Sequence, residues 1–222
     1  MARIRVCFPH AAFYFYIREG NKLQECDTDK ARSLRPFFQR MPFSHLRLVY
    51  PIFVVPYLPR HGTTGGCYRP NRVRRWLGQE HETGVSDADL ERFVLEPGSG
   101  IIGIPKRKWE ATGFKWTVLH EVAHSVDYAR NYRLYPAGTR AADFDGVTAF
   151  PEGTNNVSEH AVEVYARIIG QAPNICRETA EFQRRGESQA AADQRVVGVL
   201  RRGPAFRSLP SSWWTDVGWP AR

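Results

Sequence analysis

One stretch of the chain, residues 113–132, constrains the fold more than any other, because its apolar residues repeat at helical spacing. At about 100° per residue, five apolar side chains share one arc of a helix: Val118, Leu119, Val122, Ala123 and Val126. The opposite arc carries five polar side chains: His120, Glu121, His124, Asp127 and Tyr128. A helix with a continuous apolar stripe has to bury that stripe against other elements. The stretch is therefore predicted to be a helix that lies on a core.

Around this helix the chain has a strand-rich first part and a helical second part. Alternating and continuous apolar runs predict strands, and capping and stop signals bound further helices. The predicted strands are residues 3–17, 45–55 and 98–106, the predicted helices are residues 156–170 and 176–202, and residues 60–79 are predicted to be a Gly- and Arg-rich loop. Strands followed by helices indicate an α+β fold.

The polar arc of the helix over 113–132 contains the HExxH pattern, from His120 to His124. Residues four apart lie one above the other, so both imidazoles can reach one ion at about 2.0–2.1 Å. Glu121 lies beside the first histidine, where its carboxylate can take a proton from a metal-activated water without being a ligand. The alternative is a set of ordinary polar-face residues, but a buried His-Glu-His cluster needs partners. The pattern predicts Zn²⁺ bound by His120 and His124, with Glu121 as general base.

A catalytic zinc also needs a third protein ligand and an open position. The helix predicted over 156–170 offers Glu159, His160 and Glu163 on its polar face, and Glu159 lies 35 residues beyond His124. We expect Glu159 to be the third ligand. Glu159 has an alternative role as the carboxylate of a capping box that begins at Asn156. His160 and Glu163 are the other candidate ligands, and Glu163 has a further alternative in supporting a ligating imidazole.

The segments HEVAHSVD (residues 120–127) and EHAVEVY (residues 159–165) resemble the zinc-peptidase domain of anthrax lethal factor and related gluzincin-type bacterial toxin proteases. The resemblance extends over residues 98–170. It implies a zincin-like fold, in which an edge strand of a mixed sheet packs on the HExxH helix beside a second, ligand-bearing helix. It also implies that Glu159 is the third zinc ligand and that Glu163 and Asp127 are supporting residues. A peptide substrate would then lie antiparallel along the strand at residues 100–105.

The chain departs from that family at one position of the mechanism. The family places a transition-state-stabilising tyrosine about two turns before the ligand glutamate, and the corresponding segment here, FPEGTNNVSEH, contains none. Five other side chains are candidates for donating to the oxyanion: Tyr128, Tyr132, Tyr135, Tyr165 and His160.

The charge balance bears on partners rather than on chemistry. The 222 residues contain 31 Lys and Arg against 23 Asp and Glu, a formal net charge of +8. Such a charge favours acidic partners, so we expect a protein or peptide substrate with acidic segments and a cognate immunity or inhibitor protein. Basic stretches with a tryptophan occur at 69–76 and 106–109. We interpret them as cationic surface, so nucleic acid is not the expected partner.

We expect one zincin-like domain over residues 1–222. Its parts are a strand-rich region at 1–95, the catalytic core at 96–175, and a C-terminal helix with a Trp-rich tail at 176–222. No run of eighteen apolar residues occurs, so membrane insertion is not expected. The apolar start is interrupted by Pro9 and His10 and lacks a clear cleavage site. We therefore expect a cytoplasmic protein or one exported by a specialised secretion system.

Two functions follow from these features. The first is a zinc-dependent metalloendopeptidase, which the resemblance places among bacterial effectors or toxins. The second is a basic nucleic-acid- or protein-binding module whose zinc site is structural or vestigial. The second would require a further protein ligand that closes the zinc, so the coordination number separates the two.

Overall fold

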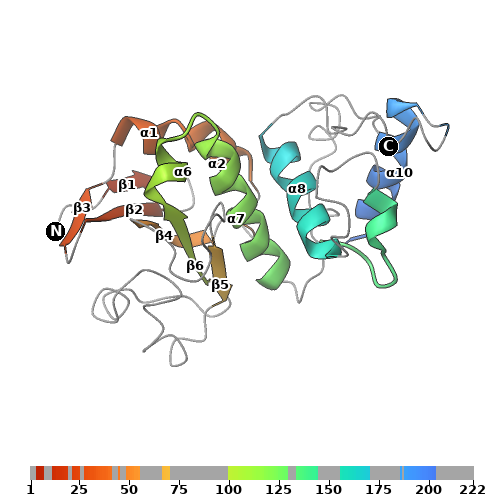
Figure 1. Ribbon diagram of the computed structural model, residues 1–222, viewed down its shortest axis with the longest axis horizontal. Helices are drawn as coiled ribbons and strands as arrows, with labels where there is room; N and C mark the ends of the chain where they lie inside the picture. The colour runs from red at the N-terminus through yellow and green to blue at the C-terminus, as the bar shows by residue number, and fades with distance from the viewer. Residues whose placement is uncertain are drawn as a thin grey trace. The chain divides into compact units, whose positions relative to one another are not determined.

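The computed structural model describes the polypeptide in twelve parts: residues 4–7, 12–19, 22–25, 28–41, 45, 49–55, 67–70, 100–129, 134–144, 156–170, 186 and 188–203. The chain divides into two compact units, Met1–Ser125 and Val126–Arg222, and the division falls within helix α7. Figure 1 shows strands and helices in the first unit and helices in the second. The described residues therefore confirm the α+β class.

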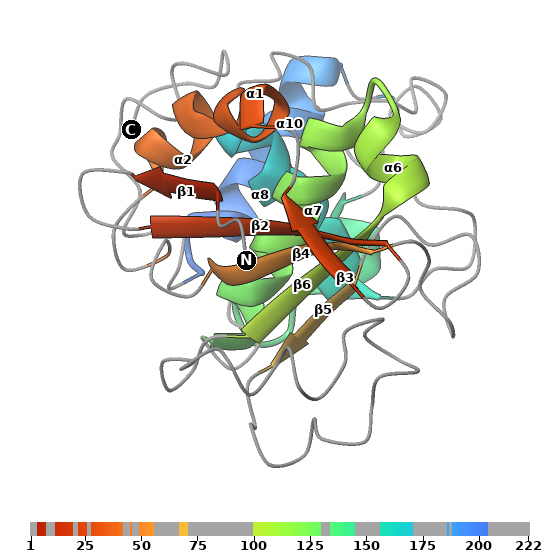
Figure 2. The same ribbon diagram turned by 90° about the vertical axis from the view of Figure 1, so that its left-hand side faces the viewer.

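The first unit contains a six-stranded mixed sheet in the order β1-β2-β4-β6-β5, with β3 also paired to β2. The strands are β1 (Ile4–Cys7), β2 (Ala12–Glu19), β3 (Lys22–Glu25), β4 (Val49–Val55), β5 (Cys67–Pro70) and β6 (Gly100–Pro105). Strands β2, β4 and β6 run parallel, and β5 runs antiparallel to β6. Strands β1 and β3 pair antiparallel with successive halves of β2 (Figure 2).

The central strands are apolar because parallel strands are usually covered on both faces. Ile52 and Val54 of β4 pair with Ile102 and Ile104 of β6. All four side chains are 0% exposed. Residues two apart point to the same face of a sheet, so these four form one buried layer. This layer confirms a strand within each of the ranges predicted at 45–55 and 98–106, although residue 45 itself is helical.

Among the described residues, three helices lie in the first unit and a fourth begins there: α1 (Thr28–Arg32), α2 (Arg35–Arg40), α6 (Lys106–Glu110) and α7 (Phe114–Ala129). Helix α6 connects β6 to α7, and Figures 1 and 2 both show α7 beside the sheet. Aromatic contacts hold the start of α7. Phe114 meets Trp109 edge to face at 5.1 Å between centroids, and Lys30 Nζ lies 4.6 Å from the Phe114 ring. Lys115 Nζ lies 5.6 Å from the ring of Phe37.

The strand predicted before the HExxH helix is present as β6, but its predicted place at the sheet edge is wrong. Strand β4 pairs with one side of β6 and β5 pairs with the other, from Cys67 opposite Gly103 to Pro70 opposite Gly100. Among the described strands, the one at that edge is therefore β5, which comes from the segment predicted to be a loop. Four residues contain too little alternation to signal a strand, and β5 obtains its hydrogen bonds by pairing with β6.

In the second unit, α8 (Val157–Ile169) carries the EHAVEVY segment and confirms the helix predicted over 156–170. Asn156 caps it, because the Ser158 N–H donates to Asn156 Oδ1 at 3.1 Å. Helices α8 and α10 (Gln189–Leu200) both contact the short 3₁₀ helix η2 (Ala141–Phe144). Arg195 of α10 donates a hydrogen bond to the Asp143 carbonyl oxygen.

The helix predicted over 176–202 is present as α10, which begins only at Gln189. The prediction of one helix through Gly186 is wrong, because Gly186 forms a turn with a positive φ of 70°. Residues 176–185 and the Trp-rich tail lie outside the described residues. Among the helices that the structure describes, none combines the length and apolar character needed to cross a bilayer.

Candidate metal centre

Helix α7 presents the HExxH residues as the sequence predicts. The five residues of its apolar arc are at most 1% exposed: Val118, Leu119, Val122, Ala123 and Val126. His120 and His124 are half-buried, whereas Glu121 is buried at 5% exposure. The two imidazole centroids are 4.9 Å apart, with the ring planes at 78°. Burial of the apolar arc thus leaves both rings on one side of the helix, close enough to share an ion.

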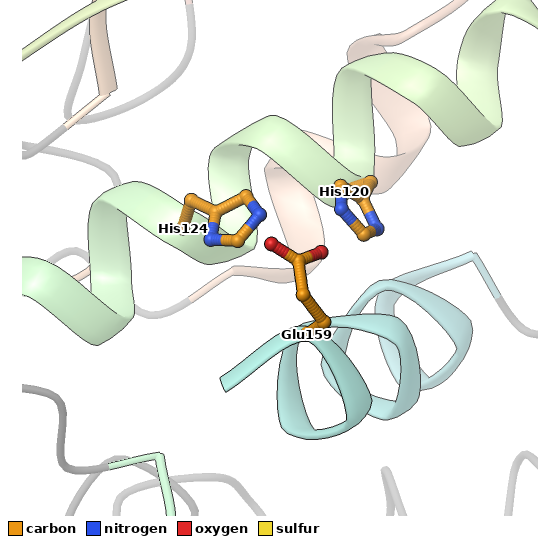
Figure 3. Close-up of side chains that lie close together, drawn as sticks. All are labelled: His120, His124 and Glu159. Carbon is orange, nitrogen blue, oxygen red and sulfur yellow. The ribbon is translucent and has the colours of Figure 1, made fainter. Parts of the chain in front are cut away.

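Glu159, in the first turn of α8, completes a three-residue cluster with these histidines. One potential ligand atom from each of His120, His124 and Glu159 lies within 4.8 Å of the other two. Figure 3 shows the Glu159 carboxylate pointing toward both imidazoles. A tetrahedral zinc with bonds of about 2.0–2.1 Å keeps its ligand atoms about 3.3 Å apart, so small side-chain rotations suffice for binding. The cluster could hold a metal ion, and its two nitrogens and one oxygen fit the donor set of zinc.

A part-buried hydrogen bond connects the end of α7 to the start of α8. Asp127 is 1% exposed, and its Oδ2 accepts from Ser158 Oγ at 2.5 Å. Its Oδ1 accepts from the Leu134 N–H at 3.0 Å. Asp127 lies one turn beyond His124 on the same helix, and Ser158 immediately precedes Glu159. The bond therefore joins the helical turns on either side of the cluster.

The other two candidate ligands on α8 have different surroundings. His160 is 7% exposed and stacks on Phe144, at 5.5 Å between centroids and 9° between planes. Glu163 Oε1 accepts hydrogen bonds from Arg167 Nη2 at 2.9 Å and Nε at 3.2 Å. Among the described residues, the cluster that could hold a metal includes Glu159 and neither His160 nor Glu163.

The candidates for oxyanion stabilisation also differ in their surroundings. Tyr165 is 0% exposed, and burial raises the pKa of its hydroxyl far above the usual value. Tyr128 and Tyr135 are half-buried, and Tyr128 follows His124 by one helical turn. Tyr132 lies outside the described residues.

Sequence reasoning missed two side chains that support the site region, Ser158 and Arg167. The i,i+4 spacing of Glu163 and Arg167 is a pattern that could have revealed their ion pair. No local pattern links Ser158 to Asp127, because 31 residues separate them. Long-range hydrogen bonds of this kind become visible only in the folded chain.

Comparison of the chain with models of known protein families, with curated proteins and with solved structures finds no match. The functional interpretation of the site therefore rests on its residues and their geometry.

Proposed function

We propose that this protein is a zinc-dependent metalloendopeptidase of the zincin, gluzincin type. One observation carries the proposal: His120, His124 and Glu159 bring their ligand atoms within 4.8 Å of one another. Two histidines and a glutamate form a donor set of catalytic zinc sites, which leave a position open for water or substrate. The HExxH spacing adds Glu121 beside the first ligand, where such chemistry needs a proton acceptor.

Each side chain then has a role in hydrolysing a peptide bond. A zinc ion in this site would supply an activated water and polarise the scissile carbonyl. The Glu121 carboxylate accepts the proton of the attacking water and transfers it to the leaving amine. Because Glu121 is 5% exposed on a helix packed along its apolar arc, its position relative to His120 is restricted. Restricting the proton acceptor in this way lowers the entropic cost of the reaction.

We assign stabilisation of the developing oxyanion to Tyr128. Among the candidates in the described part of the chain, Tyr128 is half-buried and lies on α7 itself, one turn beyond His124. Its phenol hydroxyl is a hydrogen-bond donor of the kind that stabilises tetrahedral intermediates. Tyr165 is fully buried, and His160 is stacked on Phe144. Neither of these two side chains has surroundings suited to contact with a substrate.

The net charge of +8 supports a substrate with acidic segments, since opposite charge steers association. The same charge would favour an acidic immunity or inhibitor protein. Together with the resemblance to toxin proteases, it leads us to propose a bacterial effector that acts on proteins. The alternative function is a basic nucleic-acid- or protein-binding module with a structural zinc, and the test distinguishes it from the peptidase.

The test compares the native chain with three variants. Glu121→Gln is expected to retain zinc and to lose peptidase activity by about 10²–10⁴-fold, whereas His120→Ala loses the zinc. Glu110→Gln is the matched control, because the Glu110 side chain on α6 is 60% exposed and lies outside the cluster. Zinc is measured by elemental analysis, and cleavage is measured by mass spectrometry of new N-termini in a proteome-derived peptide library.

Two results would contradict the proposal. One is cleavage by Glu121→Gln at the native rate. The other is a zinc closed by a fourth protein ligand in a native chain that cleaves no peptide. A steep loss of nucleic-acid affinity with added salt would then favour the binding module.

A further inference from the structure

The Asp127 carboxylate is one of the few buried charges that the structure describes, and both of its oxygens accept hydrogen bonds. Oδ1 accepts from the backbone N–H of Leu134 at 3.0 Å, and Oδ2 accepts from the Ser158 hydroxyl at 2.5 Å. Asp127 is 1% exposed and Leu134 is 0% exposed. Hydrogen bonds to an ionised acceptor are shorter and stronger than neutral ones, and more so away from water. The carboxylate therefore has a fixed orientation, which is set by the segment that follows α7.

Ser158 is likewise held at two atoms. Its backbone N–H donates to Asn156 Oδ1 at 3.1 Å, and its hydroxyl donates to Asp127 Oδ2 at 2.5 Å. These bonds fix the first turn of α8 both to its own cap and to the end of α7. Glu159 is the next residue in that turn, so its backbone position follows from the position of Ser158.

We propose that Asp127 and Ser158 are positioning residues that hold Glu159 in place for the metal before the metal binds. This inference rests on the proposed zinc site. Asp127 lies one turn beyond the ligand His124, and Ser158 lies one residue before the ligand Glu159. A bond between them keeps the two ligand-bearing turns at binding distance, so zinc does not have to organise α8. A site organised beforehand binds more tightly, because less ordering takes place on binding.

The test measures zinc affinity, which is separate from peptidase activity. Ser158→Ala removes the hydroxyl donor and leaves the three ligands intact. We expect the apparent zinc Kd to rise about 10-fold to about 100-fold, the usual effect of losing a residue that supports a ligand. Ser158→Thr keeps a hydroxyl and is expected to stay within a few-fold of the native Kd. Zinc is titrated into the full metal-free chain in competition with a chromophoric chelator, at a temperature where every variant is folded.

Ser125→Ala is the matched control, because it removes a serine hydroxyl from α7 whose hydrogen bond stays within one helix. Ser125 is buried, and its hydroxyl donates to the Val122 carbonyl oxygen at 2.6 Å. Urea unfolding without metal measures how much stability each substitution removes. A purely structural role for Ser158 predicts a loss of stability with no change in Kd, as expected for Ser125→Ala. If Ser158→Ala does not fold, Ser158→Val and Ser158→Thr decide the question, because they differ only in a methyl and a hydroxyl group.

The outcomes separate this inference from the proposed function. A native chain that binds no zinc would overturn the proposed function, and the positioning role with it. The positioning role alone would be overturned if the native chain binds zinc and Ser158→Ala leaves the Kd unchanged. Equal Kd values for Ser158→Val and Ser158→Thr would overturn it in the same way. The combined variant Asp127→Ala/Ser158→Ala should bind zinc no more weakly than Asp127→Ala, because both substitutions remove the same bond.

Discussion

The buried ion pair on α8 allows a direct test of which glutamate serves the metal and which serves the fold. The side chains of Arg167 and Glu163 are 2% and 8% exposed, and Glu163 Oε1 accepts two hydrogen bonds from the guanidinium. The substitution Glu163→Leu removes that carboxylate and leaves the buried guanidinium in place. Hydrogen bonds to charged groups contribute about 1.5–3 kcal/mol each, so the loss of two gives about 3–6 kcal/mol. Removing one partner of a buried ion pair lowers the free energy of unfolding by a similar amount, about 3–5 kcal/mol.

For a chain of this length, 1 kcal/mol corresponds to about 2–4 °C in Tm. We therefore expect Glu163→Leu to melt about 6–20 °C below the native protein. The double variant Glu163→Leu/Arg167→Leu should regain most of this loss, because replacing a whole buried pair with apolar side chains is often nearly neutral. Urea and thermal unfolding, followed by circular dichroism in a chelator, measure both effects.

Zinc content is measured on the same variants. Glu163→Leu should hold zinc at the native stoichiometry, whereas Glu159→Ala should not. Two results would refute the reasoning. One is a double variant as unstable as Glu163→Leu, which would show that the pair does not act as a unit. The other is loss of zinc in Glu163→Leu at unchanged stability, which would make Glu163 the third ligand.

Two further predictions concern the metal and the oxyanion. Zinc at a free concentration of 100 times its Kd should stabilise the native chain by about 2.7 kcal/mol, measured by calorimetry with and without a chelator. If zinc stabilises His120→Ala by the same amount, the ion binds at another site. Tyr128→Phe should lower kcat by about 10²–10³-fold, as loss of one oxyanion donor does, with the zinc content and KM unchanged. If Tyr128→Phe keeps the native kcat, another side chain donates to the oxyanion, and Tyr135 would be tested next.

The two ligand-bearing helices were predictable from the sequence because their signals are local. The apolar arc of α7 repeats at helical spacing and is buried in the structure. Asn156 and Gly170 bound α8 as start and stop signals do, and the helix runs from Val157 to Ile169. Helix geometry alone predicted His120 and His124 and left Glu159, His160 and Glu163 as candidates for the third ligand. The family resemblance implied Glu159, which is the residue that the structure brings into the cluster.

The features that escaped prediction depend on partners distant in the chain. Strand β5 is four residues long and is defined by its pairing with β6. Helices α1 and α2, of five and six residues, are too short to show a periodic pattern. The order of strands, which puts β6 inside the sheet, follows from those pairings as well. The Asp127–Ser158 bond likewise exists only once α7 and α8 have formed.

The pairing of β1 and β3 with successive halves of β2 has a consequence for self-association. The outer border of the described sheet on that side consists of two strands of four residues each, and the border on the other side is β5, also of four residues. Four residues span only about 13 Å, too little for a long ladder to a second chain, and β5 ends at Pro70, which has no N–H to donate. Short borders of this kind discourage the edge-to-edge stacking that leads to aggregates. Within the described residues, the strands at both borders of the sheet are therefore poor templates for further growth.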